Sequence, residues 1–383
     1  MALRILLDVR HARDFGIGTY IRNLVRALGS LDREDRFILT GRPTDFEVLD
    51  PLPENFELVE YHRSGEELWD QVAFPWFIKG FAPDVCHIPL NAVPLCMPKP
   101  YVVTIHDMSS LMFPDQTQPQ PRLLAYRFRR GLERADKIIA VSAATRRDVE
   151  KLLGIPPQRI RQIYNAPDPR FLERSPEETA AEQAERARIL QRYGIEYPFL
   201  LYAGNVRVQK NIPRLIEAFA VVRGELDSHP IYRDLRLIVI GDEIAKNPAV
   251  RRAVIQTRVE HMVRFLGFVP LETLRVFYQA TAAFVFPSLY EGFGLPPLEA
   301  MACGAPVVAS GVSSLPEVVG DAAMLVNPEK VFDIARGIRE VLLDERLRAR
   351  MIERGYQQVK RFSWERTAQE VLETYREVAA AGR

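Results

Sequence analysis

Short apolar segments alternate with helical patterns along the whole chain, and no other feature restricts the fold more. Parallel strands need a long crossover between them, usually a helix, so this alternation is typical of a parallel sheet covered by helices. The predicted strands of the first half are 4–9, 36–40, 85–88, 101–105, 137–141 and 161–164. Those of the second half are 199–203, 235–240, 263–266, 283–286, 306–309 and 323–326. The pattern predicts an α/β protein with two doubly wound halves.

A polar segment separates the two halves. Residues 174–192 are rich in Glu, Ala and Arg and predict a helical connector with little to bury. A chain of 383 residues is also long for a single core. We therefore expect a boundary between about Phe171 and Tyr197, with a first domain at 1–172 and a second domain at 195–362. In such sheets ligands bind at the carboxyl ends of the strands, and paired domains bind them in the cleft between the domains.

Composition excludes several classes of protein. The net charge of +1 argues against a nucleic-acid-binding surface. The three cysteines are spaced neither for zinc nor for a disulfide framework, which fits a reducing compartment. The apolar stretch between Arg4 and Asp8 is too brief for a signal peptide, and no apolar run is long enough to span a bilayer. We expect a cytoplasmic protein, at most attached to a membrane face.

The segment 283–310 has the features of a phosphate site. An apolar strand runs into the turn Glu-Gly-Phe-Gly at 291–294, and Glu299 is expected to open the helix that follows. The glycines leave backbone N–H groups uncovered, so that an anion can approach them. Pro296 and Pro297 suit the first turn of a helix, whose N-terminus adds partial positive charge.

Two carboxylates, Glu291 and Glu299, flank this anion site. A site for phosphate alone would avoid them. They are explained if the ligand also carries sugar or ribose hydroxyls, because carboxylates accept hydrogen bonds from such groups. The alternative is a helix-capping carboxylate beside a surface turn, but the coincidence of constrained residue types favours a ligand site.

The second half begins with another strand, turn and helix. Gly204 ends the strand, and Asn211 can cap the helix. Lys210 lies just before that helix, where its ammonium could neutralise a phosphate, and Arg207 is a second candidate. Taken alone, both could be solvated loop cations. Combined with the turn at 291–294, a phosphate role is favoured.

In the first half, His106 and Asp107 follow a buried strand at its carboxyl end. A histidine there can face the cleft and hydrogen-bond to a reacting sugar, although an isolated histidine is more often structural. His87 occupies a similar strand end and is interpreted as structural.

The loop after the first strand contains Gly16 and Gly18. It is not a dinucleotide fingerprint, because the third glycine position holds Ile21 and the first glycine follows the strand too late. A flexible loop that lets backbone approach a substrate is the better interpretation.

Other catalytic patterns are missing from the sequence. It contains no His-Glu-x-x-His, Cys-x-x-Cys or Gly-x-Ser-x-Gly motif. It also lacks the Asp-x-Asp pair that would hold a divalent ion against a diphosphate. We therefore expect no metal, because Lys210 and a helix N-terminus could carry the charge of a leaving diphosphate.

The segment EGFGLPPLEAMACGAPVVAS resembles the Glu-x7-Glu signature of retaining glycosyltransferases with the GT-B fold, family 4 (group 1). Other segments resemble further landmarks of that family, in the same order: VTIHD, IIAVSAATRRDV, GNVRVQKN, GFVP and SSLPEVVGDAA. The resemblance covers essentially the whole chain. It implies two Rossmann-like domains facing a central cleft, with the C-terminal helix at 363–383 crossing back to the first domain.

The resemblance also implies roles for individual residues. Glu299 would bind the ribose of a nucleotide-diphosphate sugar, Glu291 the transferred sugar, and Lys210 the diphosphate. His106 would touch the transferred sugar near its reacting centre, so that His106, Glu291 and Lys210 form the catalytic set. The remaining donor-binding residues would be Gly292, Phe293, Gly294, Leu295, Asn205, Arg207, Gly16 and Gly18.

Two positions depart from the family pattern. Asn205 stands where many members carry an arginine, which leaves open whether Arg207 supplies the second phosphate cation. Ala166 stands where glycine is commoner, which predicts a stiffer hinge.

The resemblance implies a metal-independent hexosyltransferase that retains the anomeric configuration and acts in polysaccharide biosynthesis. The donor would be a GDP- or UDP-linked sugar, with no other cofactor, and the acceptor a hydroxyl of a glycan or glycolipid. The Asn205 branch favours a mannosyl group. The alternatives are a non-catalytic sugar-nucleotide-binding protein on the same fold, or another GT-B enzyme such as a phosphorylase or an epimerase.

The segment PRLLAYRFRRGLERADK predicts a basic helix. Such helices bind anionic lipid surfaces, so peripheral contact with the inner face of the membrane is one hypothesis. A crossover helix with a solvated face is the alternative that the pattern favours. The residues concerned are Leu123, Leu124, Arg127, Phe128, Arg129, Arg130 and Arg134.

Overall fold

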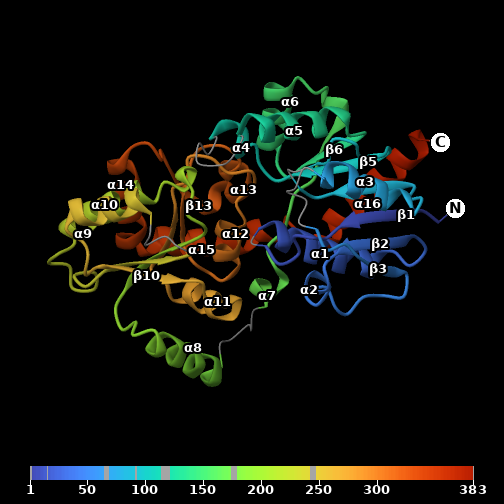
Figure 1. The fold of residues 1–383 in the computed structure, drawn as a ribbon. Helices are drawn as coiled ribbons and strands as arrows, with labels where there is room; N and C mark the ends of the chain where they lie inside the picture. Colours follow the sequence, from blue (N-terminus) through green and yellow to red (C-terminus); the bar gives the residue numbers. More distant parts are fainter. Residues whose placement is uncertain are drawn as a thin grey trace. The chain divides into compact units, whose positions relative to one another are not determined.

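The computed structural model describes residues 2–14, 16–63, 69–90, 93–113, 121–173, 179–241 and 247–382. The chain divides into two compact units. The first unit comprises Met1–Ala166 together with Phe362–Arg383, and the second comprises Pro167–Arg361. Figure 1 shows a separate sheet with its own helices in each unit.

The first unit has a seven-stranded parallel sheet in the order β3-β2-β1-β4-β5-β6-β7. The strands are β1 (Arg4–Asp8), β2 (Arg36–Gly41), β3 (Phe56–Glu60), β4 (Val85–Ile88), β5 (Tyr101–Ile105), β6 (Lys137–Ala140) and β7 (Ile160–Gln162). The helices are α1 (Ile17–Leu31), α2 (Pro43–Phe46), α3 (Asp70–Lys79), α4 (Ser109–Met112), α5 (Pro121–Arg134), α6 (Ala143–Leu153) and α16 (Trp364–Ala381).

The second unit has a six-stranded parallel sheet in the order β10-β9-β8-β11-β12-β13. The strands are β8 (Phe199–Ala203), β9 (Arg236–Ile240), β10 (Val263–Gly267), β11 (Ala283–Phe286), β12 (Val307–Ser310) and β13 (Ala323–Val326). The helices are α7 (Pro169–Leu172), α8 (Ala180–Arg192), α9 (Ile212–Glu225), α10 (Pro248–Thr257), α11 (Leu271–Ala280), α12 (Leu295–Ala302), α13 (Leu315–Val319), α14 (Val331–Leu343) and α15 (Glu345–Val359).

Both sheets reverse their strand order once, which confirms the predicted pair of doubly wound domains. The chain builds β1 to β3 in one direction and continues from β4 in the other; the same reversal separates β8 from β11. Ligands of doubly wound sheets bind outside the carboxyl ends of the strands at this reversal. The loops after β8 and β11 are therefore the expected ligand-binding loops of the second unit.

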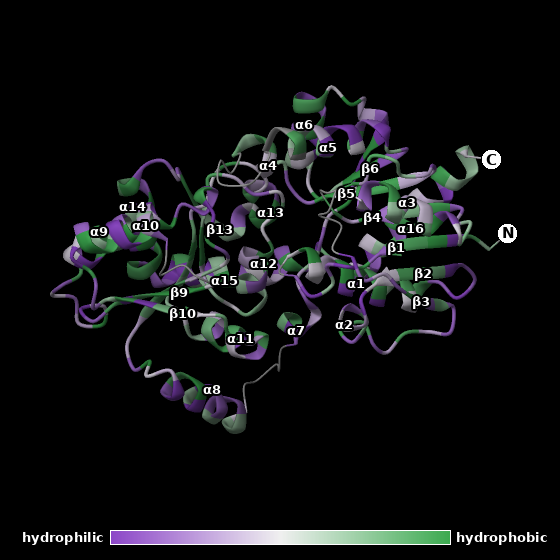
Figure 2. Ribbon diagram, in the orientation of Figure 1, coloured by the Kyte–Doolittle hydropathy of each residue, from purple (hydrophilic) through white to green (hydrophobic). Residues whose placement is uncertain are grey.

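The strands form the core because most of them are apolar on both faces. The strands β4, β5, β8, β11 and β12 are buried at every residue. Figure 2 shows the strands of both sheets largely in the hydrophobic colour, whereas α8 carries many hydrophilic residues. None of the residues of α8 is fully buried, as expected for the polar connector.

The segment between the units packs with the second unit. Residues 167–172, which we expected at the end of the first domain, belong to the second compact unit. Phe171 explains this position, because its fully buried ring packs edge-on against Tyr278 of α11 at 5.7 Å.

The C-terminal helix α16 is part of the first unit. It packs along α1, and its residues Trp364 and Tyr375 are buried. The Thr367 hydroxyl donates to the carbonyl of Tyr164 at 2.7 Å, and Arg376 lies 2.8 Å from Asp32. The predicted return of the C-terminal helix to the first domain is confirmed.

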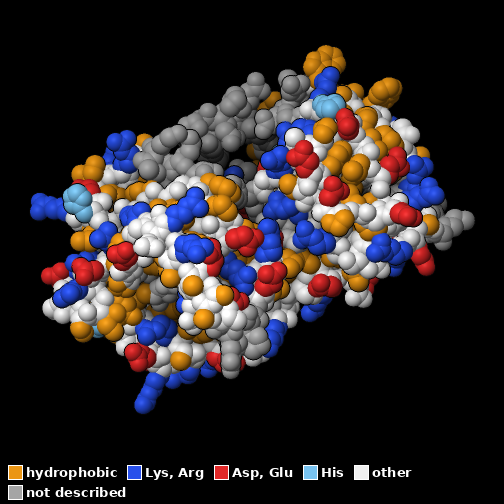
Figure 3. Space-filling view, turned by 90° about the horizontal axis from the view of Figure 1, so that it is seen from below, with side chains coloured by type: hydrophobic (Ala, Val, Ile, Leu, Met, Phe, Trp, Pro, Cys, Tyr) orange, Lys and Arg blue, Asp and Glu red, His pale blue; other side chains and the backbone are white. Residues whose placement is uncertain are grey.

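The surface is mixed in charge. On the face drawn in Figure 3, acidic and basic side chains are interspersed, in line with the net charge of +1. Among the helices that the structure describes, none combines the length and the apolar character needed to cross a bilayer.

Candidate active site

The turn between β11 and α12 is built around Gly294. Its φ of 109° is left-handed, and a Cβ atom there would lie 2.6 Å from Leu315 Cδ2. Both constraints require glycine. Helix α12 begins at Leu295, so Glu299 lies in its second turn rather than at its start. The reason is that Pro296 and Pro297 are compatible with the first turn and do not delay the helix.

Two serines that the sequence analysis did not single out hold this turn. The Ser314 hydroxyl donates to the carbonyls of Glu291 at 3.0 Å and Phe293 at 2.7 Å. The Ser313 hydroxyl donates to the Glu291 carbonyl at 2.5 Å. Both serines belong to the segment SSLPEVVGDAA, so the family resemblance was the available signal for them.

The structure brings Lys210 and Glu291 together. Lys210 Nζ lies 2.6 Å from Glu291 Oε1 and 2.8 Å from Oε2, and only 15% and 10% of the two side chains are exposed. Lys210 comes from the loop after β8 and Glu291 from the loop after β11, the two strands that flank the reversal. The backbone N–H of Leu289 donates to the Gln209 carbonyl at 2.7 Å and fixes the two loops to each other.

Glu299 lies half-buried on α12, with the Tyr278 hydroxyl 3.4 Å from its Oε2. The pKa of the Glu299 carboxyl is raised to about 8, mainly by burial and in smaller part by the nearby Asp168 carboxylate, against the opposing effects of Tyr278 and Arg170. In the free protein at neutral pH this carboxyl is therefore mostly protonated. It can both donate a hydrogen bond to a hydroxyl group and accept one from it.

Asn205 and Arg207 lie on the exposed part of the loop after β8. The Asn205 carbonyl accepts a hydrogen bond from the Tyr202 hydroxyl at 3.1 Å. Arg207 forms no ion pair with any residue that the structure describes, so its charge is available to a ligand. Asn211 precedes α9, but its side chain does not cap that helix. Instead its Nδ2 donates to the carbonyls of Pro287 and Pro328, which ties this loop to its neighbours.

His106 follows β5 in the first unit. Its Nε2 lies 3.2 Å from the Pro89 carbonyl, and its ring packs edge-on against Tyr20 at 5.0 Å. A carbonyl only accepts, so Nε2 carries the proton and Nδ1 keeps its lone pair. Burial lowers the pKa of His106 to about 4, against the opposing effects of Asp107 and the Pro89 carbonyl. The imidazole is therefore neutral at physiological pH.

Gly16 and Gly18 have different roles in the loop before α1. Gly16 has a φ of 70° and no atom within 4 Å of where a Cβ would be, so its backbone is open to approach. Gly18 is buried, and a Cβ there would lie 2.6 Å from the Ala12 carbonyl oxygen. The absence of a side chain at Gly18 serves packing inside the loop.

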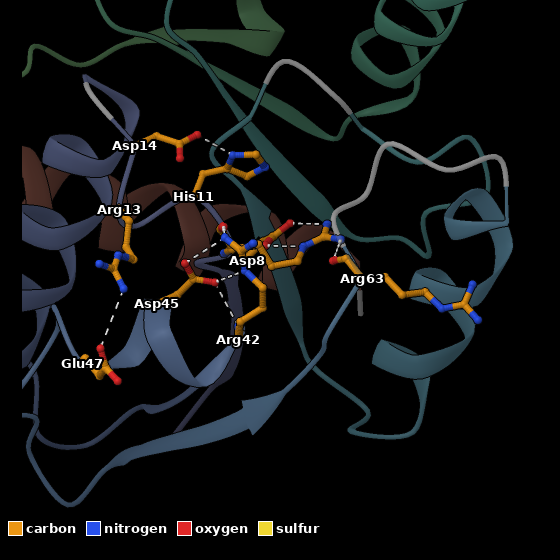
Figure 4. A network of polar contacts seen from close by, with 9 residues as sticks. Asp8, His11, Arg13, Asp14, Arg42, Asp45, Glu47 and Arg63 are labelled. Carbon is orange, nitrogen blue, oxygen red and sulfur yellow. Dashed lines mark hydrogen bonds and ion pairs between the residues drawn. The ribbon is translucent and has the colours of Figure 1, made fainter. Parts of the chain in front are cut away.

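A polar network at the carboxyl ends of β1 and β2 was not anticipated from the sequence. Figure 4 shows this network. The buried Asp8 forms an ion pair with Arg10 at 2.7 Å, and Arg42 forms one with the buried Asp45 at 3.0 Å. The Arg10 guanidinium also lies 4.0 Å from the centre of the Phe74 ring. Arg42 also donates to the Arg10 carbonyl at 3.2 Å, which ties the start of the loop after β1 to the loop after β2. The alternation of apolar segments predicts the strand that ends at Asp8, but it does not predict the partners of this carboxylate.

The basic helix α5 presents fewer cations than its sequence indicates. Arg127 and Phe128 are buried, and Arg134 donates to the backbone carbonyls of Leu95 and Met97. Arg129 and Arg130 are exposed, and Arg130 lies 3.5 Å from Glu133. The side chain of Leu124 lies outside the described part of the structure.

No group of three or more His, Cys, Asp or Glu side chains that could hold a metal ion occurs among the described residues. In the second unit, the candidate site consists of one paired lysine, two carboxyls and a helix N-terminus. Such groups suit a ligand that has both negative charge and hydroxyls.

Two family profiles match the chain. The profile described as "Glycosyl transferases group 1" matches residues 185–358, and the one described as "Glycosyltransferase Family 4" matches residues 16–171.

Curated proteins similar to the chain include two mannosyltransferases of Escherichia coli. O-antigen chain mannosyltransferase B is 33% identical over 305 residues, which cover 79% of this chain and 76% of the relative. The serotype-specific mannosyltransferase WbdA is 31% identical over 278 residues, which cover 72% of this chain and 33% of that longer protein.

Solved structures with the same fold include two further proteins. Sucrose-phosphate synthase from Thermosynechococcus elongatus has a TM-score of 0.75 at 20% identity, over 99% of this chain and 100% of that chain. HepE of Anabaena, solved with UDP and glucose, has a TM-score of 0.75 at 19% identity, over 98% of this chain and 100% of that chain.

Proposed function

The chain belongs to the glycosyltransferases of family 4 (group 1) with the GT-B fold, and we propose that it transfers a hexosyl group from a nucleotide-diphosphate sugar to an acceptor hydroxyl of a glycan or glycolipid. The observation that carries this proposal is the buried Lys210–Glu291 pair beside the N-terminus of α12. The names of the E. coli relatives favour mannose as the transferred sugar. The UDP in the HepE structure supports a nucleotide-linked donor.

Lys210 binds the donor diphosphate in this proposal. Its ammonium already lies in a water-poor position, where charge stabilisation is stronger than in bulk water. Gly292, Phe293, Gly294 and Leu295 form the turn at the start of α12, where backbone N–H groups and the helix dipole favour an anion. Arg207 and Asn205 approach the same phosphates from the loop after β8. Together these groups stabilise the charge that develops as the diphosphate leaves.

The two carboxyls bind hydroxyl groups. Glu291 accepts hydrogen bonds from the transferred sugar once the diphosphate competes for Lys210. Glu299 binds the ribose hydroxyls, and its raised pKa means that it can act as donor or acceptor there. His106 is neutral and interacts with the sugar near its reacting carbon.

The proposed reaction keeps the anomeric configuration. The bond from the anomeric carbon to the phosphate oxygen breaks, and the diphosphate takes the bonding electrons. The acceptor oxygen bonds to the same face of that carbon, and its proton passes to the departing phosphate oxygen. No side chain acts as general base, and no metal is required because Lys210 and α12 neutralise the leaving group.

The test uses the purified full chain. Thermal-shift measurements with UDP-, GDP- and ADP-sugars identify the donor, because a ligand bound to the folded state raises the melting temperature. Transfer to glycan and lipid-linked acceptors is then followed by NMR of the product, with and without EDTA. Retained configuration and unchanged rates in EDTA are expected. Binding of a nucleotide sugar without transfer or nucleotide release would instead indicate a non-catalytic binding protein.

A further inference from the structure

A buried chain of hydrogen bonds joins four elements of the first unit. The Tyr375 hydroxyl of α16 lies 2.5 Å from His87 Nδ1 on β4, and His87 Nε2 lies 2.7 Å from the Thr104 hydroxyl on β5. The Thr104 hydroxyl lies 3.0 Å from the Tyr20 hydroxyl on α1. All four side chains are at most 1% exposed. None of them is used by the proposed reaction.

This series of hydrogen bonds contains no charged group. Burial lowers the pKa of His87 to about 3, so the imidazole is neutral and donates from one nitrogen while it accepts at the other. Each buried polar atom of His87 therefore has a partner. Removing one partner would leave a buried polar group unsatisfied, which makes the arrangement costly to disturb.

Tyr20 connects this series of hydrogen bonds to His106. The rings of Tyr20 and His106 pack nearly perpendicular, with centroids 5.0 Å apart and an angle of 79° between their planes. On other sides Tyr20 contacts the ring of Trp364 on α16 at 5.9 Å and the ring of His87 at 6.4 Å. Its hydroxyl is bound to Thr104. These contacts fix the orientation of the Tyr20 ring, and this fixed ring packs against His106.

His106 needs such a contact. Its one hydrogen bond to the protein among those described, from Nε2 to the Pro89 carbonyl, fixes one atom of the ring and permits rotation about that bond. Packing against Tyr20 limits the rotation and so determines where Nδ1 points. Misplacing a reacting group by about 1 Å can cost about 100-fold in rate.

We propose that Tyr20 is a positioning residue for His106, and that the C-terminal helix α16 holds Tyr20 in place through Trp364 and Tyr375. The inference rests on the proposed function, because it assigns His106 a part in the transfer. It makes α16 a functional part of the site rather than only a cover for the sheet.

Two substitutions at Tyr20 separate its ring from its hydroxyl. Tyr20→Leu removes the ring that packs on His106 and is expected to lower kcat about 10- to 100-fold, with little change in the KM for the donor. Tyr20→Phe keeps the ring and should lower kcat only a few-fold. Tyr375→Phe removes the hydroxyl at the other end of the hydrogen-bond series, and its kcat should resemble that of Tyr20→Phe.

Tyr101→Leu is the matched control. Tyr101 is equally buried in the same unit, and its hydroxyl donates to the Gly131 carbonyl at 2.7 Å, but it lies at the opposite end of β5 from His106. A general loss of packing would affect both leucine variants alike. Equal kcat values for Tyr20→Leu and Tyr101→Leu, or a wild-type kcat for Tyr20→Leu, would overturn the proposal.

NMR of ¹⁵N-labelled histidine tests the positioning independently of activity, with His106→Gln used to assign the resonances. The wild-type protein should show His106 protonated at Nε2, and Tyr20→Leu should show a mixture of the two tautomers. Tyr20→Phe should retain the wild-type spectrum, and this comparison holds even if Tyr20→Phe is the only variant that folds. An unchanged His106 spectrum in Tyr20→Leu would also refute the role of Tyr20. If His106→Gln retains full transfer activity while the spectra change as expected, the catalytic role of His106 fails and the positioning stands.

Discussion

Lys210 and Glu291 form an ion pair with 2.6 Å between Nζ and Oε1, and most of both side chains is buried. Breaking a buried ion pair by removing one partner leaves the other charge uncompensated. A donor diphosphate would supply the missing negative charge to Lys210 and release Glu291 for the sugar. The pair therefore couples phosphate binding to recognition of the transferred group.

This coupling predicts opposite effects of Glu291→Gln on binding and on turnover. The substitution leaves the Lys210 charge without its partner, so nucleoside diphosphates should bind more tightly, by about 10-fold for a gain of about 1.4 kcal/mol. Transfer should fall by about 100-fold or more, because the sugar loses its carboxylate. Calorimetry with UDP and GDP and a transfer assay measure the two effects. Glu225→Gln, which breaks the exposed pair with Arg339, is the matched control and should change neither. Weaker diphosphate binding in Glu291→Gln would contradict the coupling.

Glu299 predicts a pH-dependent stability. Its pKa is about 8 in the folded protein, above the value of 4.5 for an exposed carboxyl. Between these values the folded state binds more protons than the unfolded state, so rising pH lowers the free energy of unfolding across that range. Glu299→Gln removes this effect. Its melting temperature should match wild type near pH 4.5 and exceed it by about 2–4 °C at pH 8, if about 1 kcal/mol of the cost survives solvent screening. A gain that is constant with pH would show that the carboxyl is not the cause.

The chemistry of these residues was predictable, and their partners were not. The turn chemistry around Gly294 and the family signature indicated Glu291, Glu299 and Lys210 from the sequence. That Lys210 and Glu291 form an ion pair depends on the two loops that flank the strand reversal, and these lie 81 residues apart. The raised pKa of Glu299 likewise depends on its burial and on the nearby Asp168 carboxylate, which periodicity cannot place beside it.

Among the elements, the buried strands were the most predictable and the exposed edge strand β3 the least. All twelve predicted strands agree with the structure to within one residue at their start, because continuous apolar runs survive in buried parallel strands. The strand β3 was missed. Its residues Glu57, Leu58 and Glu60 are exposed, so the segment lacks an apolar run, and it pairs only with β2 at the edge of the sheet.

The start of α12 predicts a strong requirement for Gly294. Gly294→Ala combines a positive φ of 109° with a contact of 2.6 Å to Leu315, whereas Gly154→Ala faces a positive φ of 65° with no atom within 4 Å. The backbone term alone costs about 1–2 kcal/mol. Gly294→Ala should therefore lower the free energy of unfolding by more than Gly154→Ala and should also weaken donor binding, which Gly154→Ala should not. Denaturant unfolding and donor titration of both variants measure this. Equal destabilisation would indicate that Leu315 moves aside without cost.

At the scale of the whole molecule, alternation of strands and helices was sufficient to predict two doubly wound domains. It did not determine which unit the linking segment joins. The segment 167–172 packs with the second unit, where the buried ring of Phe171 lies against Tyr278 and Arg170 lies 3.8 Å from Glu272. Neither hydrophobic periodicity nor turn residues distinguish such a contact from packing on the other side.

The return of α16 predicts that the end of the chain stabilises its beginning. Trp364, Val371 and Tyr375 are buried against elements built from the first 166 residues, while the second unit ends before this helix. A chain that stops at Arg361 exposes the apolar surface around Tyr20 and leaves His87 without its Tyr375 partner. Hydrogen exchange should then be faster in β4 and β5, because these strands lose the helix that packs on them, and unchanged in β8 and β11. As a control, replacing Glu373 and Glu377 by Gln removes the ion pairs of α16 with Arg161 and Lys137 but keeps its apolar face, and should leave the exchange of β4 near that of the wild type. Equal protection of β4 in the truncated and full-length chains would mean that the first unit folds without α16, and that the helix does not hold Tyr20.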